Sequence, residues 1–194
     1  KGIQGDHPDY LLAMACAKHY AVHSGPERDR HRFNAQPSER DLYETYLPQF
    51  ERVVREGKVA GVMSAYNAID GTPCSINPLL YQLLAKWGFG GHVTSDCGSV
   101  ADLSRTYKRA PDDAAAEAMT LRAGMNVRCG GEPVELVQAV QRGLITEAEI
   151  DRRLHDLLRT LFRLGFFDPR ADVPFNAIAP SENDTPAHGA LALQ

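Results

Sequence analysis

Short apolar runs alternate along the chain with longer segments in which apolar residues recur at helical spacing. The short runs predict β-strands, because glycine or polar residues bound them and two of them contain β-branched residues. They cover residues 11–22, 59–66, 92–95 and 125–129. The first run is ambiguous, since "YLLAMACA" could end a helix that precedes a short strand "KHYAV".

Five longer segments predict helices by the spacing of their apolar residues. They cover residues 38–56, 77–87, 112–123, 132–141 and 146–164. Pro48 lies inside the first segment, so we expect a kink or a break there. The last segment is the clearest, because Thr146 and Glu149 form a capping box, its apolar residues make one stripe, and Gly165 ends it.

The alternation of strands and helices, with repeats of about 30 to 45 residues, predicts parallel βαβ units. Four such units make half of a (β/α)8 barrel, whose usual length is about 250 residues. A doubly wound sheet fits the same alternation, but no Gly-x-Gly-x-x-Gly fingerprint opens any of the helices. We therefore predict an α/β fold that is a partial TIM-like barrel. Residues 166–186 are proline-rich and irregular, which indicates a linker or surface loop, and "AHGALALQ" is typical of the first turns of a helix.

Composition and charge exclude several classes of function. The 194 residues are 43% hydrophobic and 24% charged, which is typical of a globular domain. The net charge of −4, with basic and acidic residues interleaved, provides no basic field for nucleic acid. No apolar run approaches the roughly 18 residues that a membrane helix needs. Because the chain opens at Lys1 rather than at a methionine, we expect a fragment or a processed form.

The cysteines and histidines give no pattern that indicates a metal site. The four cysteines stand far apart without a Cys-x-x-Cys pair, so a structural zinc site is not predicted. Three disulfide connectivities are open, and we expect buried free thiols. His19 and His23 are four residues apart, a spacing that on a strand does not place both on one metal.

Polar residues stand at the ends of the predicted strands, where a barrel of this type places its active site. They are Lys18 and His19, then Met63, Tyr66 and Asn67, then Ser95 and Asp96, and finally Asn126, Arg128 and Cys129. We expect a cation, an imidazole, a phenol and a carboxylate to converge there, a set that can bind hydroxyl-rich substrates and attack an electrophilic carbon. The structural alternatives stay open: Asp96 as a cap, Lys18 as an ion-pair partner and Tyr66 as a core aromatic.

Two further motifs have ordinary and functional interpretations. "GPERDRHRF" at residues 25–33 is typical of a solvated charged loop, and a loop after a strand can also fold over the site. "CGGEP" at residues 129–133 could bind an anion at the start of a helix, which would suit a phosphate-binding barrel enzyme.

Several motifs in the same order resemble the family-three glycoside hydrolases, in the branch that includes β-xylosidases and some β-glucosidases. They are "KHYAVHSGPERDRHRFNA", "RDLYETYLPQF", "VAGVMSAYNAIDGTPCSINPLL" and "WGFGGHVTSDCGSVADL". The likeness runs from about Ala13 to Asp168 and is therefore more specific than any single motif.

The resemblance implies a role for each residue that matches the family pattern. Asp96 falls on the nucleophile of the Ser-Asp-(Trp or Cys)-Gly motif, and Lys18 and His19 fall on the pair that binds sugar hydroxyls. Tyr66 matches a tyrosine beside the nucleophile, and Met63 is placed at the sugar pocket. One departure is Asn126, where the family usually has aspartate.

The resemblance also implies an organisation in domains. Residues 1–168 would be the second half of the barrel, about its last four βα units, and residues 169–194 the linker and first helix toward an α/β sandwich domain. That domain would supply the acid/base glutamate, so we expect this fragment to be inactive alone.

The implied activity is that of a retaining, exo-acting β-glycosidase, a β-xylosidase or β-glucosidase that removes terminal non-reducing sugars through a covalent glycosyl-Asp intermediate. Oligosaccharides or aryl β-glycosides would be the substrates, with no cofactor, metal, nucleic acid or membrane involved. The alternative is a non-catalytic carbohydrate-binding module. A periplasmic or secreted location would suit the full-length parent, and the residues themselves identify no compartment.

Overall fold

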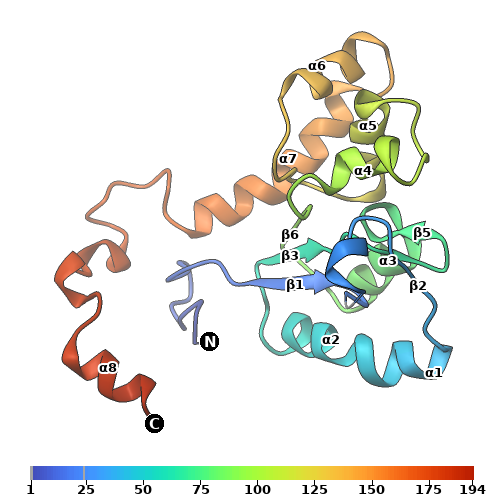
Figure 1. The fold of residues 1–194 in the computed structure, drawn as a ribbon. Coiled ribbons are helices and arrows are strands. Elements are labelled where there is room, and N and C mark those ends of the chain that lie inside the picture. The colour runs from blue at the N-terminus through green and yellow to red at the C-terminus, as the bar shows by residue number, and fades with distance from the viewer. Residues whose placement is uncertain (1, 24) are drawn as a thin grey trace.

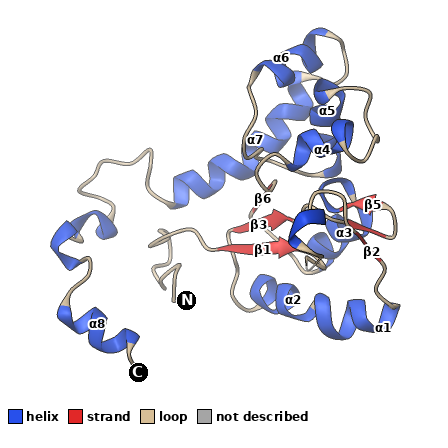
Figure 2. Ribbon diagram, in the orientation of Figure 1, coloured by secondary structure: helices blue, strands red, loops and turns tan. Residues whose placement is uncertain are grey.

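The centre of the fold is a parallel sheet of three short strands. In the computed structural model, which describes residues 2–23 and 25–194, the sheet has the order β1-β3-β6 (Figures 1 and 2). Its strands are β1 (Cys16–Tyr20), β3 (Gly61–Ser64) and β6 (His92–Thr94). Both pairings are parallel, which confirms the predicted parallel sheet.

Two of the predicted strand segments differ from the observed structure. In the first, only Cys16–Tyr20 is a strand, and residues 10–15 are not helical, so the helical interpretation of "YLLAMACA" is wrong. The segment at 125–129 forms a single parallel bridge, between Val127 and Thr94. The chain turns away directly afterwards, because Gly130 and Gly131 both adopt positive φ angles of 78° and 84°.

Most of the helices lie at the positions along the chain that the apolar spacing predicts. Before β3 lie α1 (Glu39–Asp41), the π-helical turn η2 (Leu42–Tyr46) and α2 (Pro48–Arg55). The later helices are α3 (Pro78–Lys86), α4 (Ser99–Arg105), α5 (Asp113–Ala123), α6 (Val134–Gln141), α7 (Glu147–Arg163) and α8 (Pro186–Ala192). Pro48 opens α2, which confirms the predicted break, and the capping box of Thr146 and Glu149 is present.

Some short elements were not predicted. Helix α4 has only seven residues, and its N-cap is Gly98 with a φ of 85°, so it lacks a side-chain cap and a long apolar stripe. A second sheet of two-residue strands has the order β2-β4-β5, with β2 (Asn34–Ala35), β4 (Ala68–Ile69) and β5 (Thr72–Pro73). The described residues also contain four 3-10 turns: η1 (Glu27–Asp29), η3 (Cys74–Ile76), η4 (Pro174–Ala177) and η5 (Pro180–Glu182).

The buried apolar side chains form three clusters rather than one. The first joins β1 and β3 to the helices on their flank and includes Tyr20, Phe50, Val62, Leu80 and Trp87. The second lies between α4 and α5, and the third between α5, α6 and the start of α7. In Figure 1 these last helices form a group of their own beside the sheet.

The C-terminal residues run away from the helices toward the N-terminal segment (Figure 1). Tyr10 donates a hydrogen bond to Asp168 at 3.0 Å, and the ring of His7 packs edge-on against Phe175 with centroids 6.1 Å apart. Leu191 and Leu193 at the end of the chain are exposed. Over the described residues, the helices are too short or too polar for any of them to traverse a lipid bilayer.

Candidate active site

The carboxyl ends of the three parallel strands bring Asp96, His19 and Tyr66 together. Asp96 follows β6, Tyr66 follows β3, and His19 lies in the last part of β1. The Nε2 atom of His19 is 3.3 Å from Oδ2 of Asp96, and the two side chains are 24% and 12% exposed. Because the carboxyl ends of these strands lie at one edge of the sheet, the His19 imidazole contacts the largely buried carboxylate of Asp96.

The carboxylate of Asp96 is held by its own loop and leaves one oxygen available. The N–H of Cys97 donates to Oδ1 at 2.8 Å, while Oδ2 faces His19. The side chain caps no amide of α4, whose N-cap is Gly98. The side chain therefore caps the loop amide of Cys97 and not helix α4.

Tyr66 lies against the same loop. Its hydroxyl donates to the carbonyl of Cys97 at 2.8 Å, directly after Asp96 in the chain. Burial, and then the negative charge of Asp96, raise the pKa of Tyr66 above its usual value of 10.0. The phenol therefore stays protonated at neutral pH and remains a hydrogen-bond donor beside the carboxylate.

His19 is neutral at neutral pH. Burial lowers its pKa below the usual 6.5, and the Asp96 carboxylate only partly opposes this effect. The nearby charges of His23, Lys18 and Arg30 lower the pKa further. A neutral imidazole can donate to a sugar hydroxyl or accept from one, depending on its tautomer.

The charged loop at 25–33 folds over Tyr66. The His31 ring lies 4.1 Å from the Tyr66 ring, and its Nδ1 is 2.7 Å from Oδ2 of Asp102 in α4. The Arg30 guanidinium lies 5.2 Å from the centre of the same ring. The loop therefore contacts the site through His31 and Arg30, as its place after a strand predicts, while Glu27, Arg28 and Arg32 remain solvated.

Lys18 and Met63 stand at the border of this group. Lys18 is exposed and, with His19 and His23, lines a cavity of about 400 Å³ beside α2. Met63 is half-buried within β3, opposite Thr94 of β6. Their roles toward a substrate stay predictions.

The polar residues of the fourth predicted strand point elsewhere. Asn126 accepts from the N–H of Val93 at 2.7 Å and donates to the carbonyl of Arg153 at 2.9 Å, so it ties β6 to α7. Arg128 pairs with Glu117 and Glu135. The expectation that this strand end contributes to the active site is wrong for these two side chains, because neighbouring helices bind both of them.

One bond at the site escaped sequence reasoning. Cys97, the residue after Asp96, forms a disulfide with Cys129, so the expectation of free thiols is wrong for this pair. It holds for Cys16 and Cys74. No spacing rule joins cysteines 32 residues apart, and they meet only because Val127 pairs beside β6.

The anion-binding interpretation of "CGGEP" finds no support. The small cavity that these residues line contains one cation, Arg128, and its charge is already paired with Glu117 and Glu135. Within residues 2–23 and 25–194, no group of three or more histidine, cysteine or acidic side chains is arranged to hold a metal ion.

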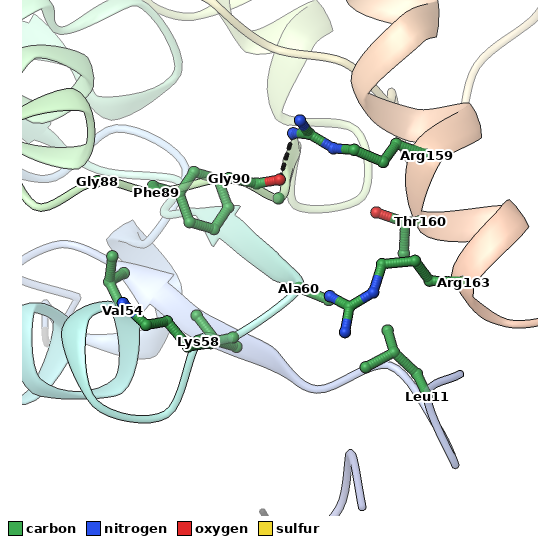
Figure 3. Close-up of a pocket in the computed structure, with 12 residues that line it drawn as sticks. Leu11, Val54, Lys58, Ala60, Gly88, Phe89, Gly90, Arg159, Thr160 and Arg163 are labelled. Atoms are coloured by element: carbon green, nitrogen blue, oxygen red, sulfur yellow. Dashed lines mark hydrogen bonds between the residues drawn. The ribbon is translucent and has the colours of Figure 1, made fainter. Parts of the chain in front are cut away.

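A separate cavity of about 390 Å³ lies at the opposite, amino ends of the strands (Figure 3). Ala60 and Gly91, which precede β3 and β6, line it together with the exposed arginines of α7. Arg159 donates to the carbonyl of Gly90 across it. This cavity contains none of the predicted site residues.

Comparisons with known proteins give one consistent result. Residues 1–160 match the model of the glycosyl hydrolase family 3 N-terminal domain. The whole chain is 41% identical to a xylan 1,4-β-xylosidase of Xylanibacter ruminicola and covers 23% of that protein. It is 39% identical to a probable β-D-xylosidase 7 of Arabidopsis thaliana and covers 27% of it.

Solved structures agree in fold. A family 3 exo-β-xylosidase in complex with a xylobiose aziridine activity-based probe superposes with a TM-score of 0.81 at 31% identity, over 89% of this chain and 23% of that one. A β-glucosidase from Erythrobacter marinus superposes with a TM-score of 0.85 at 28% identity, over 98% of this chain and 26% of that one. The chain thus spans about a quarter of the length of the relatives it matches.

Proposed function

Because this chain belongs to glycosyl hydrolase family 3 and matches its N-terminal domain, we propose that the protein it contributes to is a retaining, exo-acting β-glycosidase. The observation that carries the proposal is the Asp96 carboxylate at the carboxyl edge of the sheet. One of its oxygens accepts from Cys97, and the other lies 3.3 Å from His19. A largely buried carboxylate with one oxygen held by a backbone amide and the other facing only a neutral imidazole is suited to act as a nucleophile.

In the proposed mechanism, Oδ2 of Asp96 attacks the anomeric carbon while a second carboxyl group protonates the departing glycosidic oxygen. The product is a covalent glycosyl ester of Asp96. The second group, now a carboxylate, removes a proton from water, which attacks the anomeric carbon and restores Asp96. Such a mechanism requires the two carboxyl groups to lie about 5 to 5.5 Å apart. We propose that a glutamate of a further domain supplies the acid/base group.

The surrounding side chains would bind and orient the sugar. His19 and Lys18 would donate to ring hydroxyls and so orient the sugar for attack by Asp96. Tyr66 would hold the Asp96 loop through the Cys97 carbonyl, and Met63 would line the sugar pocket.

The names of the relatives indicate xylosides as substrates. The two curated relatives named above, at 41% and 39% identity, bear xylosidase names, whereas the β-glucosidase structure is 28% identical. We therefore propose a terminal β-xylosyl unit as the preferred substrate, with a β-glucosyl unit as the second choice.

We also propose that residues 1–168 fold as about the last four βα units of a barrel, and that residues 169–194 lead toward a further domain. Three parallel strands and the Val127 bridge support this proposal. A solved structure that includes both sides of this segment would test it directly, by placing the partner strand of β1.

A mechanism-based label tests the activity. The natural full-length protein is incubated with a 2-deoxy-2-fluoro-β-xyloside bearing a good leaving group, and the labelled peptide is sequenced by mass spectrometry. Attachment of the sugar to Asp96 is the expected result. Binding of the sugar without attachment would contradict the proposal and support a non-catalytic carbohydrate-binding module instead.

A further inference from the structure

The loop that carries Asp96 is clamped by a second segment, residues 127–131, which we call the strap. Three backbone or side-chain hydrogen bonds join the strap to the loop. They run from Ser95 N–H to Val127 O at 2.9 Å, from Cys129 N–H to Ser95 Oγ at 2.8 Å, and from Gly98 N–H to Cys129 O at 2.8 Å.

The disulfide between Cys97 and Cys129 adds a covalent link between the strap and the loop. The residues on both sides of Asp96 are therefore attached to the strap, while the Asp96 side chain points to His19. Because the link is covalent and adjacent to Asp96, a displacement of the strap displaces the carboxylate.

The strap itself is anchored by Arg128. Its guanidinium pairs with Glu117 of α5 and, at 3.1 Å, with Glu135 of α6. The Glu117 side chain is 6% exposed, whereas surface ion pairs elsewhere on the chain are largely solvated. Burial raises the pKa of Glu117, and the positive charge of Arg128 opposes that effect. Removing Arg128 alone would leave the Glu117 charge buried without compensation.

Two glycines allow the strap to lie in this position. A Cβ atom at Gly131 would overlap the Arg128 guanidinium, and its φ of 84° disfavours any side chain. A Cβ atom at Gly130 would lie 3.4 Å from the backbone nitrogen of Gly98. The glycine pair thus lets the chain pass between the guanidinium and the Asp96 loop.

We propose that Arg128 is a positioning residue for the nucleophile. Arg128 anchors the strap to α5 and α6, and the strap in turn holds the carboxylate of Asp96 at the distance from the anomeric carbon that the reaction requires. The proposal rests on the proposed function of Asp96. Arg128 itself contacts no substrate in this scheme and acts through Cys129 and Cys97. A displacement of about 1 Å at a reacting group can lower a rate by about a hundredfold, so an anchor of this kind has a large effect on turnover.

The test uses the triple variant Arg128→Met/Glu117→Gln/Glu135→Gln in the full-length protein, because removing all three charges leaves no unpaired ion in the interior. The matched control is Arg122→Met/Glu149→Gln, which removes another arginine–glutamate pair of α5 away from the strap. Melting temperature, kcat, KM and the rate of labelling by the fluorinated xyloside are measured for each protein.

We expect the test variant to melt close to the wild type, to lose about tenfold to a hundredfold in kcat and labelling rate, and to change little in KM. The control should match the wild type in kcat, KM and labelling rate, whereas its melting temperature should fall because Glu149 also belongs to the capping box of α7. Arg128→Lys should keep most of the turnover, because a lysine ammonium can still pair with Glu117.

A test variant that is folded and has the kcat and labelling rate of the wild type would overturn the proposal. An equal loss in the control would also overturn it, since the effect would then belong to helix α5 in general. Failure of the proposed function looks different, because the wild type itself would then acquire no label at Asp96.

Discussion

The two ends of the central sheet use their polar groups differently. At the amino ends, side chains bind the backbone: Gln4 donates to the carbonyl of Lys58 and accepts from the N–H of Ala60, and Arg159 donates to Gly90. At the carboxyl ends, the Cys97 backbone binds Tyr66 and one oxygen of Asp96, but the other oxygen of Asp96 faces the side chain of His19, and both of these retain unused bonding capacity.

This difference separates stability from chemistry. A polar group whose bonds are all made to the local backbone stabilises the chain and has little left for a ligand. A carboxylate oxygen with one weak partner, close to a neutral imidazole and a protonated phenol, can still form bonds. The cavity at the amino ends is well formed, yet the groups that could react lie at the opposite edge.

The largest expected effect is at the carboxyl edge. Asp96→Asn keeps the shape of the side chain and removes the nucleophile, so we expect kcat/KM for an aryl β-xyloside in the full-length protein to fall by roughly 10⁴-fold or more. The melting temperature should change little, because the Cys97 N–H can still donate to the amide oxygen. Activity near that of the wild type in this variant would show that the carboxyl edge is not the site of the reaction.

Next in size is the covalent link at the same edge. Cys97→Ala/Cys129→Ala removes a cross-link between residues 32 apart in the sequence. Because the unfolded chain then gains loop entropy, the free energy of unfolding should fall by about 3 to 4 kcal/mol. Urea denaturation measures the loss, and turnover should fall with it because Cys97 follows Asp96. Cys16→Ser, at a free thiol, is the control. Equal stability in all three proteins would show that the hydrogen bonds alone hold the strap.

A substitution at the amino edge should damage stability without damaging chemistry. A Cβ atom at Gly91 would lie 2.1 Å from the carbonyl oxygen of Ala60, so Gly91→Ala should lower the free energy of unfolding by about 2 to 3 kcal/mol. The kcat should equal that of the wild type when the enzyme concentration is taken as the concentration of molecules that react with the fluorinated xyloside. A specific loss of kcat there would mean that the amino edge takes part in catalysis.

The smallest expected effect concerns the loss of protein stability at acidic pH. His92 begins β6, is 4% exposed, and burial lowers its pKa below 6.5, a shift that nearby Asp156 opposes. The unfolded chain therefore takes up the proton more readily, so the stability contribution is complete above about pH 6.5 and is lost as the pH falls below that value. The melting temperature of His92→Asn should depend less on pH between 7.5 and 5.5 than that of the wild type.

A matched histidine sharpens this measurement. His155 is 73% exposed in its side chain, so His155→Asn should keep the pH dependence of the wild type. If His92→Asn and His155→Asn behave alike, burial at the amino edge does not control acid stability.

The sequence by itself determined the parallel sheet, most helices and the position of Asp96, His19 and Tyr66 at the carboxyl ends of its strands. The apolar spacing predicts α2, α3, α5, α6 and α7 because amphipathic periodicity and caps are local properties. Asp96, His19 and Tyr66 follow from a general rule, since carboxyl ends of parallel strands meet at one edge.

Only the tertiary structure decided which side chains at those strand ends face the carboxylate. Asn126 and Arg128 stand at a strand end just as Asp96 does, but α7, α5 and α6 bind their side chains elsewhere. The Cys97–Cys129 link and the place of His31 over Tyr66 depend on contacts between distant segments. Such contacts are set by how helices pack on the sheet, a property of the whole chain that no local pattern records.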